Sequence, residues 1–370
     1  MPANHFAASG SELISVADYE RAAAGLLDPG ALAYYAGGAA DEITMRDNVA
    51  AWQRLAIRPR VLVGVGERDA GVTVLGRPRP HPLIIAPTAY QRLAHLDGEI
   101  ATARAAAATG TVMCVATYAT TTMPAIAEAV PDVSRWFQLY VFSDRGISRE
   151  LVAQAVACGC EALVITADLA VQGVRERERR SAVQIDAESA QMLRVATAAG
   201  VCGLTPAEFA ALIDPNLSWS DIEQFAVDCP LPVLVKGILT ADDAERAAQH
   251  GARGIVVSNH GGRQLDTVLS GADALSEVVD AVGDRLDVLV DGGIRRGTDV
   301  VKALALGARA VMVGRPVLWG LAVGGADGAR AVLEILLDEL DRGLALSGVM
   351  SPTELDRSFI TPAPWAAPPR

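Results

Sequence analysis

The stretch GIVVSNHGGRQLD, residues 254–266, joins a short apolar run to a polar turn that contains two glycines. Residues 255–257 are Ile, Val and Val, and an apolar run bounded by turn residues is typical of a strand buried on both faces of a parallel sheet. Such sheets carry their chemistry at the carboxyl ends of the strands. The stretch therefore predicts a buried strand at 254–257 followed by residues of a functional site.

The turn after this strand holds a possible base and a possible anion-binding group. The imidazole of His260 can accept a proton near neutral pH, and the guanidinium of Arg263 suits a carboxylate. Gly261 and Gly262 allow a sharp turn and a close approach by a ligand. A hydrogen-bonded structural histidine is the ordinary alternative, but the neighbouring arginine and glycines favour catalysis. The pattern predicts a substrate that carries a carboxylate and loses a proton.

Apolar runs like this one recur along the chain and alternate with alanine-rich segments. Residues 240–250 illustrate those segments: Thr240 can cap a helix, Asp242 favours its first turn, and Gly251 ends it. We predict strands at 82–86, 111–116, 136–141, 162–166, 232–235, 254–257, 287–290 and 310–313. Eight strand–helix units in a chain of 370 residues that is 51% hydrophobic predict an α/β fold, a (β/α)₈ TIM barrel.

The regions outside the barrel have a different composition. Residues 1–80 are expected to form an N-terminal helical segment that packs on a barrel spanning 81–350. Residues 351–370 form a tail whose end, TPAPWAAPPR, is proline-rich and expected to be unstructured or extended. A long loop follows the fourth strand, between Asp168 and about Ser218, and is either a lid, a substrate gate or partly disordered. Its charge run at 175–180 is expected to be a solvated face.

Composition excludes several classes of function. The net charge is −12, from 32 Lys and Arg against 44 Asp and Glu, which argues against nucleic acid or an anionic membrane as partner. The five cysteines have no zinc-binding spacing, which predicts no metal site and buried thiols in a reducing compartment. The N-terminus lacks a signal-peptide pattern, and the apolar stretch 303–325 is interrupted by arginines. We expect a cytoplasmic protein that does not enter a membrane.

Two glycine-rich segments, at the ends of the seventh and eighth strands, predict a phosphate site. The sequence after strand seven is Asp291-Gly292-Gly293-Ile294-Arg295, and Gly314-Arg315 follows strand eight. This is where TIM barrels bind phosphate, through backbone amides and a helix N-terminus. Structural turns would explain the glycines but not the arginine that accompanies them at both ends.

The remaining strand ends supply polar groups around the same rim. Lys236 is either a Schiff-base nucleophile, as in an aldolase, a salt-bridge partner, or a cation beside a cofactor. With Gln138, Thr166 and Ser258 it suits a flat, heteroatom-rich ring such as a flavin. Asp168 can orient His260. Further candidates around the substrate are Arg175, as a second carboxylate clamp, and Tyr34 and Tyr140, as hydrogen-bond donors.

The motifs together resemble the FMN-dependent α-hydroxy acid oxidases and dehydrogenases, which include glycolate oxidase, lactate oxidase, mandelate dehydrogenase and hydroxymandelate oxidase. The resemblance runs from about residue 13 to 350 as a single domain. The motifs that carry it are YYAGGAADE (34–42), APTAYQRLAH (86–95), WFQLYV (136–141), ITAD (165–168), GVRE (173–176), LVKGILTADDA (234–244), VSNHGGRQLD (257–266), DGGIRRGTDVVKALALGA (291–308) and VGRPVLW (313–319).

The resemblance implies a role for each matching position. His260 would be the active-site base, Asp168 its partner, and Tyr140 the contact to the substrate hydroxyl. Arg175, Arg263 and Tyr34 would bind the substrate carboxylate. FMN would be held by Pro87, Thr88, Ala89, Gln138, Thr166, Lys236 and Ser258, with its phosphate on Asp291, Gly292, Gly293, Ile294, Arg295, Gly314 and Arg315. An (S)-2-hydroxy acid would be oxidised to the 2-oxo acid, in a homo-oligomer that the family suggests is a tetramer.

Departures from the family pattern narrow the substrate. Ala116 stands where the family often has a serine that contacts flavin, so that contact is lost or passes to Thr117. Tyr118 replaces the tryptophan of glycolate oxidases and lies among the substrate contacts, which disfavours glycolate. Tyr90 resembles the hydroxymandelate oxidase branch, which favours an aryl substrate such as (S)-4-hydroxymandelate or (S)-mandelate. No haem domain and no apolar membrane stretch are seen, which favours an oxidase that reduces O₂ to H₂O₂.

Three alternatives stay open on the sequence. The same chemistry could act on lactate or another aliphatic acid. An FMN-barrel isomerase would share Lys236 and the phosphate loops but would not need His260 beside Arg175 and Arg263. A non-catalytic binder of a phosphorylated ligand would leave those three side chains without a role.

Overall fold

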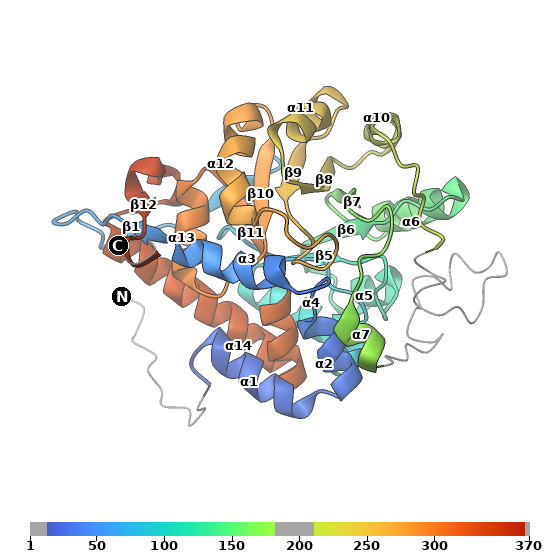
Figure 1. Cartoon of the computed structure of the whole chain (residues 1–370), viewed down its shortest axis with the longest axis horizontal. Coiled ribbons are helices and arrows are strands. Elements are labelled where there is room, and N and C mark those ends of the chain that lie inside the picture. Colours follow the sequence, from blue (N-terminus) through green and yellow to red (C-terminus); the bar gives the residue numbers. More distant parts are fainter. Residues whose placement is uncertain (1–12, 182–210, 367–370) are drawn as a thin grey trace.

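Eight parallel strands close into a barrel at the centre of the computed structural model, which describes residues 13–181 and 211–366 (Figure 1). Each predicted strand is present, and the predicted TIM barrel is confirmed. The strands are β4 (Leu83–Ile85), β5 (Val112–Val115), β6 (Arg135–Leu139), β7 (Leu163–Thr166), β8 (Val233–Ile238), β9 (Gly254–Val257), β10 (Asp287–Asp291) and β11 (Ala310–Val313), with β11 pairing back to β4.

Helices surround the barrel and connect successive strands (Figure 1). Thr240 caps α11 (Ala241–Gln249) by accepting a hydrogen bond from the backbone N–H of Asp243, as predicted. The last helix, α14 (Arg315–Ser347), bends at Gly324 and Gly325 and packs against α1 (Val16–Leu26), α4 (Gly98–Thr109) and α13 (Gly297–Ala305). The helices are α4 (Gly98–Thr109), α5 (Met123–Ala129), α6 (Arg145–Ala157), α10 (Trp219–Asp228), α11 (Ala241–Gln249), α12 (Gly271–Val282), α13 (Gly297–Ala305) and α14 (Arg315–Ser347), with short 3₁₀ turns η1 (Gln91–Leu93), η4 (Pro352–Glu354), η5 (Arg357–Phe359) and η6 (Pro364–Ala366).

Alternate side chains of the strands build two separate cores. Leu83 and Ile85 point outward and pack under the helices, while Ile84 between them points into the barrel. Trp136 and Met312 join Ile84 in the interior cluster, and all three are buried. Because both faces are covered, the strands read as continuous apolar runs, which is why the sequence reveals them.

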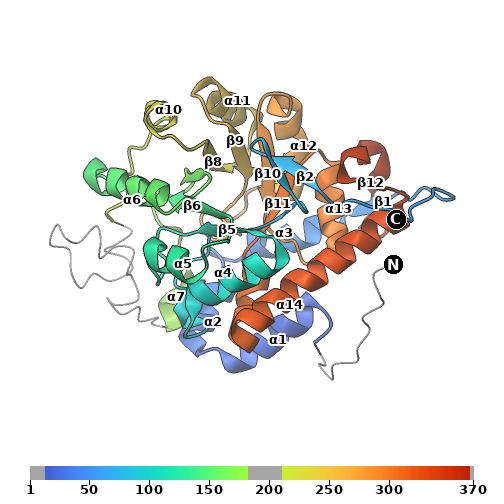
Figure 2. The same cartoon turned by 180° about the vertical axis from the view of Figure 1, so that it is seen from behind.

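The N-terminal segment is helical up to Gln53 as expected, but residues 54–80 contain short strands and no helix, so the expectation of a helical segment is corrected for that part. After α1 (Val16–Leu26), α2 (Pro29–Ala36) and α3 (Ile43–Gln53) come β1 (Leu55–Ile57) and a hairpin of β2 (Val72–Val74) and β3 (Arg77–Arg79). The hairpin turns at Leu75 and Gly76, both with positive φ, as tight hairpins require. Val74 belongs to the interior core, and Figure 2, the view from behind, shows β2 beside β10, where the Leu75 N–H donates to the Asp287 carboxylate (2.5 Å).

The proline-rich tail, which is described up to residue 366, contains a strand and a short 3₁₀ turn. Residues Ile360–Pro362 form β12, which pairs antiparallel with β1, and the indole N–H of Trp365 donates to the carbonyl of Gln53 (3.0 Å). Thus the tail is extended only in part and is fixed to the end of α3.

The long loop after β7 is described at its two ends. Its first part contains α7 (Glu176–Ser181), and near its other end Ile213 forms an isolated bridge with Phe142. The expectation of a lid or gate falls largely on residues 182–210, which lie outside the described residues. Among the helices of the described part of the chain, none combines the length and hydropathy that crossing a membrane requires.

Candidate active site

A cavity of about 1270 Å³, counting the part open to solvent, lies at the carboxyl ends of the barrel strands. Its size accommodates a nucleotide-sized cofactor beside a small substrate. Nearly all the predicted site residues line it: Tyr34, Pro87, Thr88, Ala89, Tyr118, Gln138, Tyr140, Thr166, Arg175, Lys236, His260, Arg263, Asp291, Gly292, Gly293, Ile294, Arg295, Gly314 and Arg315. Asp168, Thr117 and Ser258 are not among the lining residues, and each contacts one that is.

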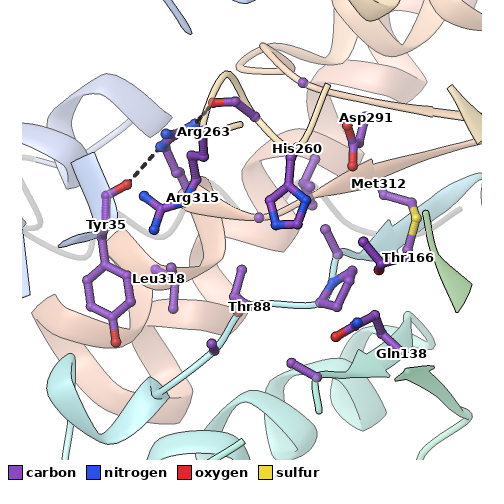
Figure 3. Close-up of a pocket in the computed structure, with 18 of the residues that line it drawn as sticks. Tyr35, Thr88, Gln138, Thr166, His260, Arg263, Asp291, Met312, Arg315 and Leu318 are labelled. Atoms are coloured by element: carbon purple, nitrogen blue, oxygen red, sulfur yellow. Dashed lines mark hydrogen bonds between the residues drawn. The ribbon is translucent and has the colours of Figure 1, made fainter. Parts of the chain in front are cut away.

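The close-up in Figure 3 shows how these groups are distributed. Arg263 and Arg315 lie beside Tyr35 at one end of the cavity. Gln138 and Thr166 lie at the other end, and His260 points into the space between.

His260 forms a buried pair with Asp168. The imidazole Nδ1 lies 2.9 Å from Asp168 Oδ1, and Nε2 lies 3.3 Å from the Tyr140 hydroxyl. Burial lowers the pKa of His260, and the opposing effect of Asp168 does not cancel it. Burial would raise the pKa of Asp168, but the attraction and hydrogen bond to His260, together with the positive charge of Lys236, outweigh burial and the pKa is lowered. At neutral pH the pair is therefore an ionised carboxylate and a neutral imidazole, which is the proton-accepting form.

The backbone at His260 is strained. His260 has φ +60°, a left-handed conformation that costs a non-glycine residue about 1–3 kcal/mol and persists where neighbours fix it. Its backbone N–H donates to Ser258 Oγ (3.1 Å), which also accepts from Lys236 Nζ (2.9 Å). Gly261 and Gly262 continue the left-handed turn. Ser258 therefore supports the base from behind the cavity wall.

Two guanidinium groups face the cavity near His260. Arg263 donates to the carbonyls of Tyr34 and Gly37 and lies over the Tyr34 ring, 4.8 Å from its centroid. Arg175 donates to the carbonyl of Arg263 (3.2 Å) and to Gln264 Oε1 (3.0 Å). Burial lowers the pKa of Arg263, and the positive charge of Arg175 lowers it further. Such a pair favours an anionic ligand.

The charge run at 175–180 is only partly a solvated face, which corrects the sequence interpretation. Arg175 is 9% exposed, while Arg179 and Arg180 are exposed as expected. The helix α7 therefore turns one side of the run toward the cavity, and the spacing of three residues from Arg175 places Glu178 there as well.

Tyrosines form one wall of the cavity. Tyr34, Tyr35, Tyr90, Tyr118 and Tyr140 line it, five of the six tyrosines in the chain. The rings of Tyr90 and Tyr118 are stacked with centroids 5.9 Å apart, and those of Tyr118 and Tyr140 are 5.2 Å apart. Burial raises the pKa of all five, so they are neutral at physiological pH. The wall suits a flat apolar group.

The end of the cavity at Gln138 fits a flavin ring. Gln138 Nε2 is a buried donor without a hydrogen-bond partner in the described structure, and Gln138 lines the cavity. Lys236 Nζ lies 3.3 Å from Asp291 Oδ2. Burial would lower the pKa of Lys236, but the carboxylates of Asp291 and Asp168 outweigh burial and raise it. This end thus offers an unused donor and a permanent cation to a heteroatom-rich ring.

Thr117 does not line the cavity, so the structure offers no direct flavin contact through it. Its hydroxyl donates to the Gln138 carbonyl (2.7 Å) and accepts from the Tyr140 N–H (3.0 Å), and its N–H donates to Gln138 Oε1 (3.1 Å). Since Oε1 is held this way, the Nε2 end of the Gln138 amide is left for a ligand. The small side chain of Ala116 lines the cavity instead.

The part of the cavity beside the loops after β10 and β11, where the phosphate site was predicted, carries more positive than negative charge. Burial, together with Arg263 and Arg295, lowers the pKa of Arg315 to about 9. The Arg315 guanidinium also donates to the carbonyls of Tyr35, Gly261 and Gly37, so it braces the N-terminal segment against the His260 turn. Gly292 and Gly293 have φ of +92° and +81° and leave their backbone uncovered on the cavity. An incoming phosphate would supply the missing negative charge.

Sequence reasoning did not assign several of the residues that line the cavity. Glu178 was treated only as part of the charge run, although its spacing of three residues from Arg175 could have indicated that it faces the cavity. The apolar members carry no chemical signal that separates them from core residues. The lining residues that the sequence did not point to are Tyr35, Ala86, Leu169, Gln172, Glu178, Met312, Val313, Pro316 and Leu318.

The chain is similar to several proteins of known function. The sequence model described as FMN-dependent dehydrogenase matches residues 23–362. The chain is 46% identical over 360 residues to an L-lactate oxidase of Nostoc sp., covering 95% of this chain and 98% of the relative. It is 42% identical to 2-hydroxyacid oxidase 1 of Homo sapiens, covering 96% and 98%. A solved structure of mandelate oxidase with (S)-4-hydroxymandelic acid superposes with a TM-score of 0.87 at 41% identity, covering 92% and 97%.

Proposed function

Since the chain belongs to the FMN-dependent dehydrogenase family, we propose that it oxidises an aryl (S)-2-hydroxy acid to the 2-oxo acid and reduces O₂ to H₂O₂. (S)-4-Hydroxymandelate or (S)-mandelate is the substrate class that best fits the cavity. The observation that carries the proposal is that one cavity holds a neutral imidazole backed by a carboxylate and two guanidinium groups beside it.

The protein's own residues account for substrate binding and proton transfer. Arg175 and Arg263 bind the carboxylate, which fixes the α-carbon relative to His260. The α-hydroxyl then faces the Tyr140 hydroxyl and His260 Nε2, which are 3.3 Å apart, and Nε2 accepts a proton. Asp168 stabilises the imidazolium that forms. FMN, when bound, takes up the two electrons of the oxidation.

The tyrosine wall supports the aryl side chain. Tyr90 and Tyr118 lie face to face next to Tyr140, so a phenyl ring on the α-carbon would meet aromatic surface. The similarity to a mandelate oxidase that binds (S)-4-hydroxymandelic acid supports the same class.

An aliphatic 2-hydroxy acid is the second candidate. The similarity to an L-lactate oxidase at 46% identity favours it, and the carboxylate clamp and base would serve lactate equally well. The isomerase and binding-protein alternatives leave His260, Arg175 and Arg263 unexplained. We also propose, from the family resemblance, a homotetramer in the cytoplasm, which size-exclusion chromatography and cell fractionation would test.

Anaerobic bleaching of the visible spectrum tests the function. Each of (S)-mandelate, (S)-4-hydroxymandelate, (S)-lactate and glycolate is added to the purified protein without oxygen, and air is then admitted. Fast bleaching by the aryl acids and recovery in air is the expected result. Bleaching by lactate alone would show that the substrate is aliphatic and not aryl. A protein that is bleached by none of the acids would overturn the proposed oxidase activity.

A further inference from the structure

Glu178 is a carboxylate inside the region that should receive the substrate carboxylate. It lies on α7, lines the cavity, and its side chain is 16% exposed. Its Oε2 lies 3.5 Å from Arg175 Nη1 and 3.9 Å from Arg263 Nη2. This oxygen is buried and has no hydrogen-bond partner in the described structure.

The neighbouring glutamate of the same helix behaves differently. Glu176 pairs with Arg180 at the surface, where its side chain is 45% exposed. Glu178 is thus the acid of α7 that turns inward. Its distances to the two guanidinium groups exceed hydrogen-bonding distance, so it contributes negative charge without occupying their N–H donors.

The charges at this end of the cavity can be counted. Arg175 and Arg263 supply two positive charges and Glu178 supplies one negative charge, which leaves one positive charge for a ligand. A monocarboxylate neutralises it. A dicarboxylate would add a second negative charge close to Glu178 in a partly dehydrated site, where an uncompensated charge is costly.

We propose that Glu178 determines specificity by restricting the site to acids with a single carboxylate. The inference rests on the proposed function, because it assumes that the substrate carboxylate binds Arg175 and Arg263. It specifies how many carboxylates the substrate carries. It also assigns this discrimination to a residue outside the His260–Asp168 pair. Glu178 acts through repulsion and leaves the reacting atoms untouched.

The test measures binding of unreactive acids to the FMN-loaded protein. Phenylacetate and phenylmalonate share the aryl group, lack the α-hydroxyl and differ by one carboxylate; acetate and malonate form a matching pair without the ring. Dissociation constants are obtained by calorimetry for the unchanged protein and for Glu178→Gln. We expect the dicarboxylate to gain about tenfold in affinity relative to the monocarboxylate in Glu178→Gln, the size that one charge a few ångströms away produces in a partly solvated site.

Two further variants complete the design. Glu178→Asp keeps the charge and should keep the discrimination, while Glu176→Gln removes the outward-facing charge and should change neither ligand. A ratio of dissociation constants that is the same in Glu178→Gln and the unchanged protein overturns the proposal, as does loss of both ligands in Glu178→Gln. If the unchanged protein binds neither phenylacetate nor acetate, the carboxylate site itself is wrong and both proposals fall.

Discussion

Asn48 and Asn259 face each other with their side-chain amides and exchange two hydrogen bonds, of 2.9 and 2.7 Å. Both are buried, and Asn259 also accepts from the backbone N–H of Gly262 (3.0 Å). Asn48 belongs to α3, whose Trp52 donates to the carbonyl of Gly292 (2.9 Å). One helix from the N-terminal segment therefore holds both the turn that carries His260 and the glycine loop after β10.

Replacing Asn48 should disturb catalysis from a distance. Asn48→Ala removes the two hydrogen bonds that Asn259 exchanges with Asn48, so that Asn259 keeps only its bonds to Gly262 and Leu269 and the left-handed turn at His260 loses a restraint. We expect kcat to fall on the order of tenfold or more, because a small misplacement of a base is costly, while the KM of the substrate changes less. Asn216→Ala, at an exposed position, is the control. A kcat equal to that of the unchanged protein would refute the role of the pair.

The pH dependence of kcat/KM should follow His260. Its pKa is lowered from the ordinary 6.5 by burial, and the base works in its neutral form, so the rate is full above this pKa and falls as pH drops through it. The acid limb should therefore lie below pH 6.5. In Asp168→Asn the group that raises the pKa of His260 is gone, so the limb should move to still lower pH while the plateau drops. Steady-state kinetics across pH checks both shifts, and an upward shift in Asp168→Asn would contradict the assignment.

Arg263→Lys should weaken substrate binding. Lysine cannot reproduce the planar fork that binds a carboxylate through two N–H groups, nor the contacts that Arg263 makes to the carbonyls of Tyr34 and Gly37. We expect KM for the 2-hydroxy acid to rise roughly tenfold or more, the effect of losing a charge-assisted hydrogen bond. Arg179→Lys, at an exposed position of α7, provides the comparison. Equal KM values in the two variants would exclude Arg263 from the carboxylate site.

Gly293→Ala should impair FMN binding. Gly293 has φ +81°, and an added Cβ would lie 1.8 Å from the carbonyl oxygen of Asn48. The glycine loop after β10 and the helix α3 must therefore move apart. Gly76→Ala is the matched control, since its φ is +72° but nothing lies within 4 Å of the new carbon. The control should lose only about 1 kcal/mol of stability and keep its visible absorbance. Loss of flavin from both variants, or from neither, would show that the contact with Asn48 is not decisive.

The barrel could be predicted from the sequence because a strand that is buried on both faces has a continuous run of apolar residues. Strands such as β9 appear as apolar runs that end in polar residues, and the His260 turn and the glycine loops stand at those ends. The cavity residues at the strand ends could therefore be predicted from the sequence. The pairing of β1 with β12 could not be predicted, because nothing in the sequence of a short strand shows which distant strand it pairs with.

Other features depend on side-chain direction, which composition does not reveal. The same six-residue helix sends Glu176 to the surface and Glu178 into the cavity. Thr117 lies beside Ala116 in the sequence, but its hydroxyl is used by the backbone of Gln138 and Tyr140. Arg315 was predicted as a phosphate ligand, and its contacts to three carbonyls could be found only from coordinates.

The pairing of β12 with β1 also bears on how the chain is made. Trp365 reaches back 312 residues to the carbonyl at the end of α3, the helix that holds Asn48 and Trp52 in place. During synthesis on the ribosome, a barrel whose strands have all emerged still lacks this tie until residue 365 has left the exit tunnel. Flavin uptake is therefore expected to be a late event, and a chain stopped before β12 should fold its strands yet hold the cofactor poorly.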